Sequence, residues 1–429
     1  MRVDAWLPRA ARAHPGRAAV NGLTYAQLDA AVDRAARVLH ARGAGPGSRV
    51  ALALPPGEAF AVALHATHRV GALAVPVDLR LTAEERPAGE VTVSKDAPLE
   101  DGDQLPPAPA AGTHELAEPA ILVHTSGTTS APKAVPLSSG NWLWSALGSG
   151  VALGVHPQER WLSALPLSHV GGLSILMRSA ISATTALVHE RFETDRVLHA
   201  LRHDGVTVVS LVPTTLGRLL DAGLAQPPAL RCALIGGGPV APELLRRARH
   251  AGVPVAQTYG LSEACSQVTT ARPGDEQPDA GPPLFCTRVR TAADGEIEVA
   301  GPTLATSGPD GWLATGDLGK LDGEGRLRVT GRKADTIVTG GENVAPTEVE
   351  AVLAEHPAVA EAAVHARPDP DWGEAVVATV VLRDGMRAQP SDLIAHCAAR
   401  LARFKVPKQV GFARELPRTR SGKLLRRAL

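Results

Sequence analysis

The sequence predicts an α/β protein with two parts: a large, multi-layer N-terminal domain with mostly parallel sheets, and a small α+β C-terminal domain. Three observations support this fold class. The 429 residues are too many for one ordinary core. Strand-like and helix-like segments alternate through the first three quarters, which favours parallel strands joined by crossover helices. Near residue 317 this alternation ends, and roughly one hundred residues with a different pattern follow, a size typical of a separate domain.

The alternation is clearest between residues 161 and 260. Because the carboxyl ends of parallel strands share one edge of a sheet, ligands bind there. Three unusual loops follow such strands: hydroxyls after 121–124, glycines after 231–235 and "YGLSE" after 253–258. We therefore expect one crevice lined by all three loops. The expected strands are 161–167, 184–190, 206–213, 231–237 and 253–260, and the expected helices are 172–182, 196–205, 214–224 and 242–252.

Two further regions have their own patterns. Residues 83–118 are rich in Pro, Ala and acids, and we expect a surface connection there. The segment "DLGKLDGEGRLRVTGR" predicts a hairpin with a glycine-containing turn. After it we expect a strand at 335–340, a helix from Pro346, strands at 360–366 and 374–382, and a helix at 392–402. The predicted domains are therefore 1–331 and 332–429.

Charge and composition exclude several classes of protein. Lys+Arg and Asp+Glu are both 44, which argues against nucleic-acid binding. The most apolar stretch, 59–79, is interrupted by His65, His68, Arg69 and Pro76, so we expect no membrane insertion. The first twenty residues lack a signal-peptide pattern, and the four cysteines form no C-x-x-C pair. We expect a cytoplasmic protein without a zinc site.

One loop has the chemistry of a phosphate site. In "ILVHTSGTTSAPKAVPL" an apolar strand ends in hydroxyls, glycine and lysine. Phosphate binding needs free backbone N–H groups, hydroxyl donors and a cation, and this loop supplies all three. The spacing is not that of a Walker loop, and a polar surface loop is the alternative interpretation. The candidate residues are Thr125, Ser126, Gly127, Thr128, Thr129 and Lys133.

The segment "TSGTTSAPKAV" resembles the phosphate-binding signature of the adenylate-forming superfamily, which includes acyl-CoA synthetases, peptide-synthetase adenylation domains and luciferases. Ser130 and Ala134 replace two glycines of the usual pattern. The resemblance implies that the loop holds the β- and γ-phosphates of ATP, with Thr129 near Mg²⁺.

Further motifs follow in the order typical of the superfamily. The resemblance implies that "GGGP" approaches adenine and that "TYGLSEA" supplies a stacking Tyr259, a hydroxyl from Ser262 and a Mg²⁺ ligand, Glu263. It further implies that Asp317 binds the ribose hydroxyls, that Arg332 lies at the ribose and domain junction, and that Lys423 of "RSGK" acts in adenylation. The resemblance also implies that the small domain is mobile and turns between the two half-reactions about a hinge at Ala334, two residues after Arg332. Taken singly, each motif could instead be a turn, a helix-start acid or a basic tail. The remaining nucleotide-binding candidates are Gly236, Gly237, Gly238, Pro239, Thr258 and Gly260.

Within the superfamily, "LPLSHVGGLSILMRS" and "QTYGLSEACSQV" resemble the o-succinylbenzoate–CoA ligases of menaquinone biosynthesis. This resemblance implies an acid–thiol ligase that uses ATP, Mg²⁺ and coenzyme A. The predicted catalytic residues are Lys423, Glu263 and His169. The second, aromatic carboxylate of such a substrate needs a cation or several N–H donors. The candidates for the substrate pocket are His169, Arg178 and Phe285, and Gly340 and Gly341 are candidates for the CoA channel.

Several alternatives stay open from the sequence. His169 could be a packed or capping histidine, and Arg178 could face solvent from its helix. The chain could be another acyl- or aryl-CoA ligase, an adenylation enzyme that loads a carrier protein, or an inactive nucleotide-binding protein. A homodimer is also open.

Overall fold

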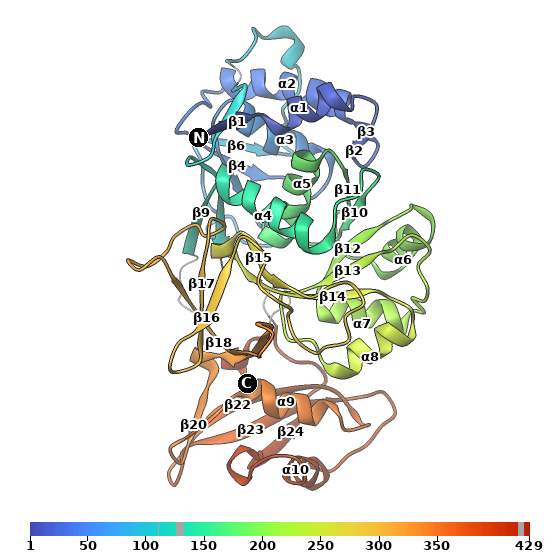
Figure 1. Cartoon of the computed structure of the whole chain (residues 1–429), viewed down its shortest axis with the longest axis vertical. Helices are drawn as coiled ribbons and strands as arrows, with labels where there is room; N and C mark the ends of the chain where they lie inside the picture. The colour runs from blue at the N-terminus through green and yellow to red at the C-terminus, as the bar shows by residue number, and fades with distance from the viewer. Residues whose placement is uncertain (110, 126–132, 419–423) are drawn as a thin grey trace.

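The structure is a computed structural model that describes residues 1–429 except 110, 126–132 and 419–423. The molecule is elongated, with the N-terminal sheets at one end and the small C-terminal domain at the other (Figure 1). The predicted mixed α/β class with mostly parallel sheets is confirmed, because most pairs in the two large sheets are parallel.

The first large sheet has the strand order β6-β4-β5-β8-β9. Helix α3 packs beside it and α2 packs against α3, and the Thr24 hydroxyl caps α2 together with Gln27 in a capping box. A small sheet of β1 and β7 and helix α1 lie at the same end. The bounds are β1 Arg2–Asp4, α1 Trp6–Ala13, α2 Tyr25–Ala41, β4 Arg49–Ala53, α3 Glu58–Arg69, β5 Leu73–Pro76, β6 Val91–Ser94, β7 Thr113–Glu115, β8 Pro119–Thr125 and β9 Lys133–Ser138.

The second large sheet has the order β15-β14-β13-β12-β10-β11-β2-β3. Helices α4 and α5 pack against each other, and α4 contacts both β9 and β15. They therefore join the two large sheets. The bounds are β2 Ala18–Val20, β3 Leu23–Thr24, α4 Ser139–Leu153, β10 Arg160–Ser163, α5 Val170–Ser182, β11 Thr185–Val188, α6 Thr194–His203, β12 Val208–Leu211, α7 Pro213–Asp221, β13 Cys232–Ile235, α8 Pro242–His250, β14 Val255–Leu261 and β15 Ser266–Thr270.

The predicted hairpin is formed by β18 and β19, in an antiparallel sheet of order β16-β17-β18-β19. The 3₁₀ turn η3, Lys333–Asp335, leads from β19 into the small domain, whose sheet β21-β20-β23-β22 is extended by β24 beside β23. The predicted boundary at Arg332 falls at the end of β19. The bounds are β16 Arg288–Thr291, β17 Glu296–Ala300, β18 Leu313–Leu321, β19 Leu327–Arg332, β20 Ile337–Thr339, β21 Glu342–Val344, α9 Pro346–Ala354, β22 Val359–Asp369, β23 Gly373–Leu382, α10 Pro390–Ala398 and β24 Gln409–Phe412.

The expectation for residues 83–118 is wrong in part. Residues 91–94 form β6, which pairs in parallel with β4 at the edge of the first sheet. Val91 and Val93 are buried, while Thr92 points outward. A strand of four residues among prolines and acids gives too short an alternation to stand out from a loop. The segment therefore contributes to the core of the sheet.

Two buried histidines, His65 and His68, and the partly buried His114 lie together at the N-terminal end. The rings of His65 and His68 are 6.2 Å apart, His68 and His114 are 6.3 Å apart, and His114 packs on Trp6 at 4.3 Å. Burial lowers the pKa of His65 to about 3, with Arg69 adding to the effect, and burial lowers the pKa of His114 to about 4. The folded state therefore keeps these rings neutral where an unfolded chain would protonate them.

This cluster predicts acid sensitivity. Because the folded pKa values lie below the ordinary 6.5, stability is fully present above about pH 6.5 and falls as the pH drops toward 4. At about pH 5 each such histidine should lower the free energy of unfolding by about 1–2 kcal/mol. Denaturant unfolding at about pH 7.5 and about pH 5 should show this loss, and His65→Leu should reduce it. The exposed His250→Gln serves as a control, and equal losses in all three proteins would contradict the assignment.

Among the described residues, no helix is both long and apolar enough to cross a lipid bilayer.

Candidate active site

Asp317 is the centre of the best-defined polar cluster. It lies in β18, is buried, and accepts a hydrogen bond from the Tyr259 hydroxyl on Oδ2 at 2.8 Å. Its Oδ1 lies 2.8 Å from Nε of Arg332, the last residue of the neighbouring strand β19. Each carboxylate oxygen keeps a further lone pair, so Asp317 can still accept bonds from two hydroxyls of a ligand. The pair Tyr259 and Arg332 thus fixes the carboxylate in one orientation.

Burial, together with the nearby Asp317 carboxylate, raises the pKa of Tyr259 well above its usual range. The phenol is therefore a neutral hydrogen-bond donor at every physiological pH. The sequence suggested only a stacking role for Tyr259, and its bond to a residue 58 positions away had no local signal.

A hollow of about 440 Å³ opens beside this cluster, lined by Thr315, Gly316, Arg332, Lys333 and Ala334. The ammonium group of Lys333 is bound to Asp294 at 2.6 Å and to Glu296 at 2.8 Å. Lys333 therefore fastens the start of the interdomain turn to the large domain. The guanidinium of Arg332 is half exposed at the rim of this hollow.

Glu263 lies in the 3₁₀ turn Ser262–Ala264, directly after β14. Its Oε1 is 3.7 Å from Nζ of Lys133, which starts β9 at the far end of the hydroxyl-rich loop. The structure thus brings together two of the predicted phosphate and metal residues. Thr125 is described at the end of β8, but Ser126, Gly127, Thr128, Thr129 and Lys423 lie outside the described residues.

The glycine-rich turn follows β13, as predicted. Gly237 has φ +79°, which favours glycine, and a side chain at Gly236 would meet Thr258 at 2.9 Å. A side chain at Gly260 would overlap the carbonyl of Ser266 on the paired strand β15. Gly238 and Pro239 are exposed in the same turn, and Ser262 begins the turn that carries Glu263. Gly236 and Gly260 therefore allow neighbouring chain segments to approach closely at the carboxyl ends of β13 and β14, while Gly238 has open space beside it.

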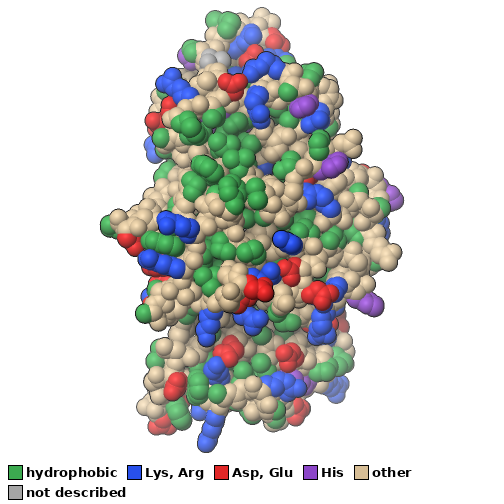
Figure 2. All heavy atoms as spheres, in the orientation of Figure 1, with side chains coloured by type: hydrophobic (Ala, Val, Ile, Leu, Met, Phe, Trp, Pro, Cys, Tyr) green, Lys and Arg blue, Asp and Glu red, His purple; other side chains and the backbone are tan. Residues whose placement is uncertain are grey.

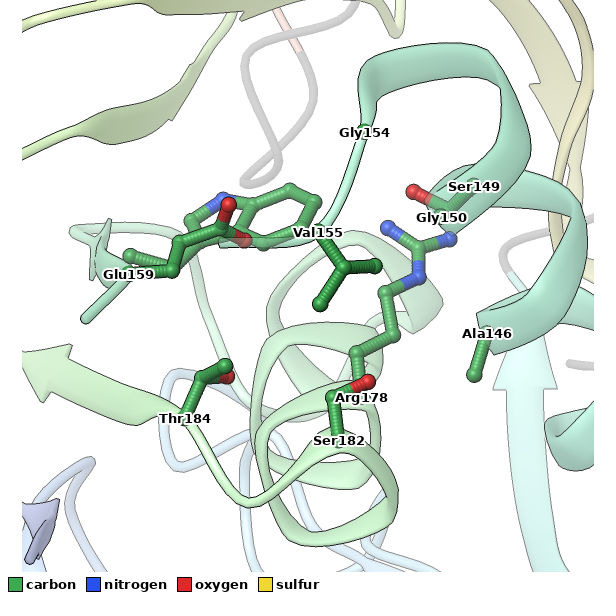
Figure 3. Close-up of a pocket in the computed structure, with 10 residues that line it drawn as sticks. Ala146, Ser149, Gly150, Gly154, Val155, Glu159, Arg178, Ser182 and Thr184 are labelled. Carbon is green, nitrogen blue, oxygen red and sulfur yellow. The ribbon is translucent and has the colours of Figure 1, made fainter. Parts of the chain in front are cut away.

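Arg178 is buried on α5 and does not face solvent (Figure 3). Its Nη2 lies 3.2 Å from the Ser145 hydroxyl of α4, and its guanidinium carbon lies 5.4 Å above the Trp161 ring. The alternative that this arginine is simply exposed is therefore wrong. Its side chain lines a narrow cavity; the other lining residues are Ala146, Ser149, Gly150, Gly154, Val155, Glu159, Trp161, Ser182 and Thr184.

Within the described part of the chain, Arg178 makes no ion pair, and its Nε has no hydrogen-bond partner. Burial lowers the pKa of Arg178 to about 10, so it remains cationic near neutral pH. The buried carboxylate in the same cavity wall, Glu159, is paired with Arg231 instead. A buried cation without an anionic partner is costly, which suggests that a ligand supplies the anion.

Ser145 links Arg178 to the Glu263 turn, because its hydroxyl donates to the carbonyl of Cys265 at 2.7 Å. The opposite face of α4 exposes Leu147 and Val151, and Figure 2 shows hydrophobic side chains gathered over this helix. One face of α4 therefore lines the Arg178 cavity and the other meets solvent. No motif in the sequence marks Ser145 and Trp161 as neighbours of Arg178, because the three residues lie on separate elements, α4, β10 and α5.

The remaining predicted residues are placed as follows. His169 is the residue before α5 and makes no side-chain capping bond. Phe285 is 57% exposed, with its ring 6.2 Å from that of Trp144, and it does not line the Arg178 cavity. Gly340 and Gly341, both with positive φ, form the turn between β20 and β21, where Gly340 packs against Trp372. The structure does not test their assigned roles.

Comparison with known families gives matches along most of the chain. The model of the AMP-binding enzyme family matches residues 7–88 and 86–307, and that of the AMP-binding enzyme C-terminal domain matches residues 348–423. A 2-succinylbenzoate–CoA ligase from Bacillus subtilis is 37% identical over 472 residues, with 99% of this chain and 97% of the relative covered.

Solved structures of an o-succinylbenzoate CoA synthetase from Bacillus subtilis are similar over the full chain at 35% identity. The complex with ATP and magnesium ion has a TM-score of 0.92 and is covered completely. The complex with the acyl-adenylate intermediate OSB-AMP has a TM-score of 0.91, with 98% of that chain covered. A double mutant bound to the product analogue OSB-NCoA, also 98% covered, has a TM-score of 0.74. The described arrangement is therefore closer to the ATP and adenylate complexes.

Proposed function

Because the chain belongs to the AMP-binding enzyme family, we propose that it is an adenylate-forming acid–CoA ligase that converts o-succinylbenzoate to o-succinylbenzoyl-CoA. In the first step a carboxylate oxygen of the acid attacks the α-phosphorus of ATP, and pyrophosphate leaves. In the second step the CoA thiol attacks the carbonyl of the acyl-adenylate, and AMP leaves. The names of the relatives and the buried cation Arg178 both support this substrate.

The Asp317 cluster fits the nucleotide end of this site. A carboxylate held by Tyr259 and Arg332 is ready to accept bonds from both ribose hydroxyls without further ordering. The open glycine turn after β13 leaves room for the adenine ring beside Tyr259. These residues bind and orient the nucleotide, so that the α-phosphate meets the acid in a fixed geometry.

Glu263 and the hydroxyl-rich loop fit the phosphate end. A partly buried carboxylate beside Lys133 has the chemistry that Mg²⁺ prefers when it is shared with phosphates, and a solved relative contains ATP and magnesium. When bound, Mg²⁺ would neutralise phosphate charge, with Glu263 and Thr129 as its expected protein ligands. Lys133 contributes a second positive charge near the leaving pyrophosphate.

Arg178 is the residue that we assign to the aromatic carboxylate of the substrate. It is a cation already desolvated in a cavity whose other charged group, Glu159, is neutralised by Arg231. A carboxylate entering this cavity would complete an ion pair, while the succinyl carboxylate remains the reacting group. His169, on the same strand–helix connection, is the second candidate for contact with the acid.

This assignment gives a selectivity prediction. Arg178→Ala should lower kcat/KM for o-succinylbenzoate roughly ten- to a hundredfold more than for an analogue that lacks the aromatic carboxylate. Arg178→Lys keeps the charge and should retain part of the selectivity. His169→Ala, measured in parallel, reports whether the histidine shares this contact. Equal losses on both substrates in Arg178→Ala would mean that the arginine only supports the fold.

The function is tested by pyrophosphate release and thioester formation with a panel of acids that includes o-succinylbenzoate. We expect the highest turnover with o-succinylbenzoate and free CoA in the presence of ATP and Mg²⁺. Good turnover of another acid, with none of o-succinylbenzoate, would overturn the substrate. Transfer to a carrier protein but not to CoA would identify a carrier-loading adenylation enzyme instead.

A further inference from the structure

Arg426, near the end of the chain, connects three separate segments of the small domain. Its Nη2 lies 2.7 Å and 2.8 Å from the two carboxylate oxygens of Glu350 on α9. Its Nη1 lies 3.1 Å from Oδ2 of Asp335, and its Nε donates to the carbonyl of Val364 in β22 at 3.1 Å. One planar guanidinium thus donates hydrogen bonds to a helix, a strand and a turn at the same time.

The position of Asp335 makes this network more than a surface ion pair. Asp335 ends the 3₁₀ turn Lys333–Asp335, and it directly follows Ala334, the predicted hinge residue. On the other side of the hinge, Lys333 is fastened to the large domain through Asp294 and Glu296. The hinge therefore lies between Lys333, which is bound to the large domain, and Asp335, which is bound to Arg426 in the C-terminal tail, residues 413–429.

Glu350 is well suited to hold the tail. Its side chain is 15% exposed, and its Oε1 also accepts a hydrogen bond from the backbone N–H of Val364 at 2.8 Å. Burial raises the pKa of Glu350, while Arg426 opposes this effect. A largely buried ion pair, in which Nη2 meets both carboxylate oxygens, holds its geometry better than an exposed pair.

The tail is also fixed before the segment that carries Lys423. Arg418 pairs with Glu361 of β22 at 2.7 Å and forms a bridge with Leu424, and the N–H of Leu425 donates to the carbonyl of Pro417 at 2.9 Å. Lys423 is three residues before Arg426, so covalent geometry keeps their Cα atoms within roughly 10 Å. The contacts of Arg418 and Arg426 therefore fix the chain on both sides of the segment that contains Lys423.

We propose that Arg426 is a positioning residue: through Glu350 and Asp335 it makes the tail move with the hinge, so that closing the small domain delivers Lys423 for adenylation. This role rests on the proposed function and adds a residue to it. Arg426 acts through the tail and not by contact with substrate or nucleotide. Without it, the C-terminal tail would lose its ties to α9 and to the interdomain turn.

The test separates the two half-reactions. In Arg426→Ala, the rate of acyl-adenylate formation, measured by ATP–pyrophosphate exchange, should fall roughly ten- to a hundredfold. That is the scale expected for a misplaced catalytic group. Thioester formation from supplied acyl-adenylate should stay near the wild-type rate. Glu350→Gln should show the same pattern more weakly. The matched control is Lys405→Ala, which removes an ion pair with Glu348 on the same helix but no contact with the tail, and it should leave both rates unchanged.

A double variant distinguishes a positioning role of Arg426 from a purely structural one. If Arg426 acts through Lys423, then Lys423→Ala combined with Arg426→Ala should be no slower in adenylation than Lys423→Ala alone. Multiplied losses, or an equal loss of both half-reactions in Arg426→Ala, would overturn the proposal. The exchange assay uses whichever acid the wild type activates best, so a wrong substrate would appear in the wild type and leave this test intact.

Discussion

Replacing Lys423 with alanine should slow formation of the acyl-adenylate by about a hundredfold or more, the largest effect that we expect from one substitution. The lysine belongs to the terminal motif that resembles that of adenylate-forming enzymes. There its ammonium group would stabilise the negative charge that develops between the attacking carboxylate and the α-phosphate. That charge exists only in the adenylation transition state, so the loss should appear in kcat.

The measurement is ATP–pyrophosphate exchange beside thioester formation from supplied acyl-adenylate and CoA. Thioester formation should remain largely intact in Lys423→Ala, because no bond to the α-phosphate forms in that step. Lys423→Arg, which keeps the charge but changes its shape, should recover little of the exchange rate. An equal fall of both half-reactions would show that the lysine does not act in adenylation alone.

The sequence predicted the fold class well because the alternation of apolar strands and helices is long and regular between residues 161 and 260. It failed at β6, where four residues give too little periodicity to be distinguished from a loop. The hairpin of β18 and β19 was predictable because glycines mark its turn.

In the candidate site, too, some features were predictable from the sequence and others were not. Asp317, Arg332 and Glu263 belong to contiguous motifs, so their residue types could be read from the chain. The bond from Tyr259 to Asp317 and the burial of Arg178 against Ser145 and Trp161 depend on packing between distant elements, and no local pattern carries that information. Arg426 looked like one charge of a basic tail, and only its contacts with Glu350 and Asp335 distinguish it.

The second large effect concerns the hinge. Ala334 lies in the middle of the 3₁₀ turn Lys333–Asp335, where φ is typically about −50° to −70°. Proline fixes φ at about −65°, so Ala334→Pro matches the φ that is typical of residue 334 in this turn. The arrangement of this chain is closer to the ATP and adenylate complexes of the Bacillus subtilis synthetase than to the complex with the product analogue. The substitution should therefore favour the adenylation state.

We expect Ala334→Pro to keep most of the ATP–pyrophosphate exchange and to slow thioester formation from supplied acyl-adenylate roughly ten- to a hundredfold. That range corresponds to the ~1–3 kcal/mol needed to force a backbone angle away from its preferred region. Ala334→Gly, which frees the same angle, is the control and should not separate the two half-reactions in this direction.

Proline also restricts the preceding residue, Lys333, which is held by Asp294 and Glu296. Loss of those ion pairs alone could lower activity, so Lys333→Met should be measured beside Ala334→Pro. If Lys333→Met reproduces the proline phenotype, the ion pairs and not the fixed angle would explain it. If the proline variant instead loses adenylation and keeps thioester formation, the turn described here belongs to the thioester-forming state. If Ala334→Pro affects both half-reactions equally, Ala334 is not the hinge.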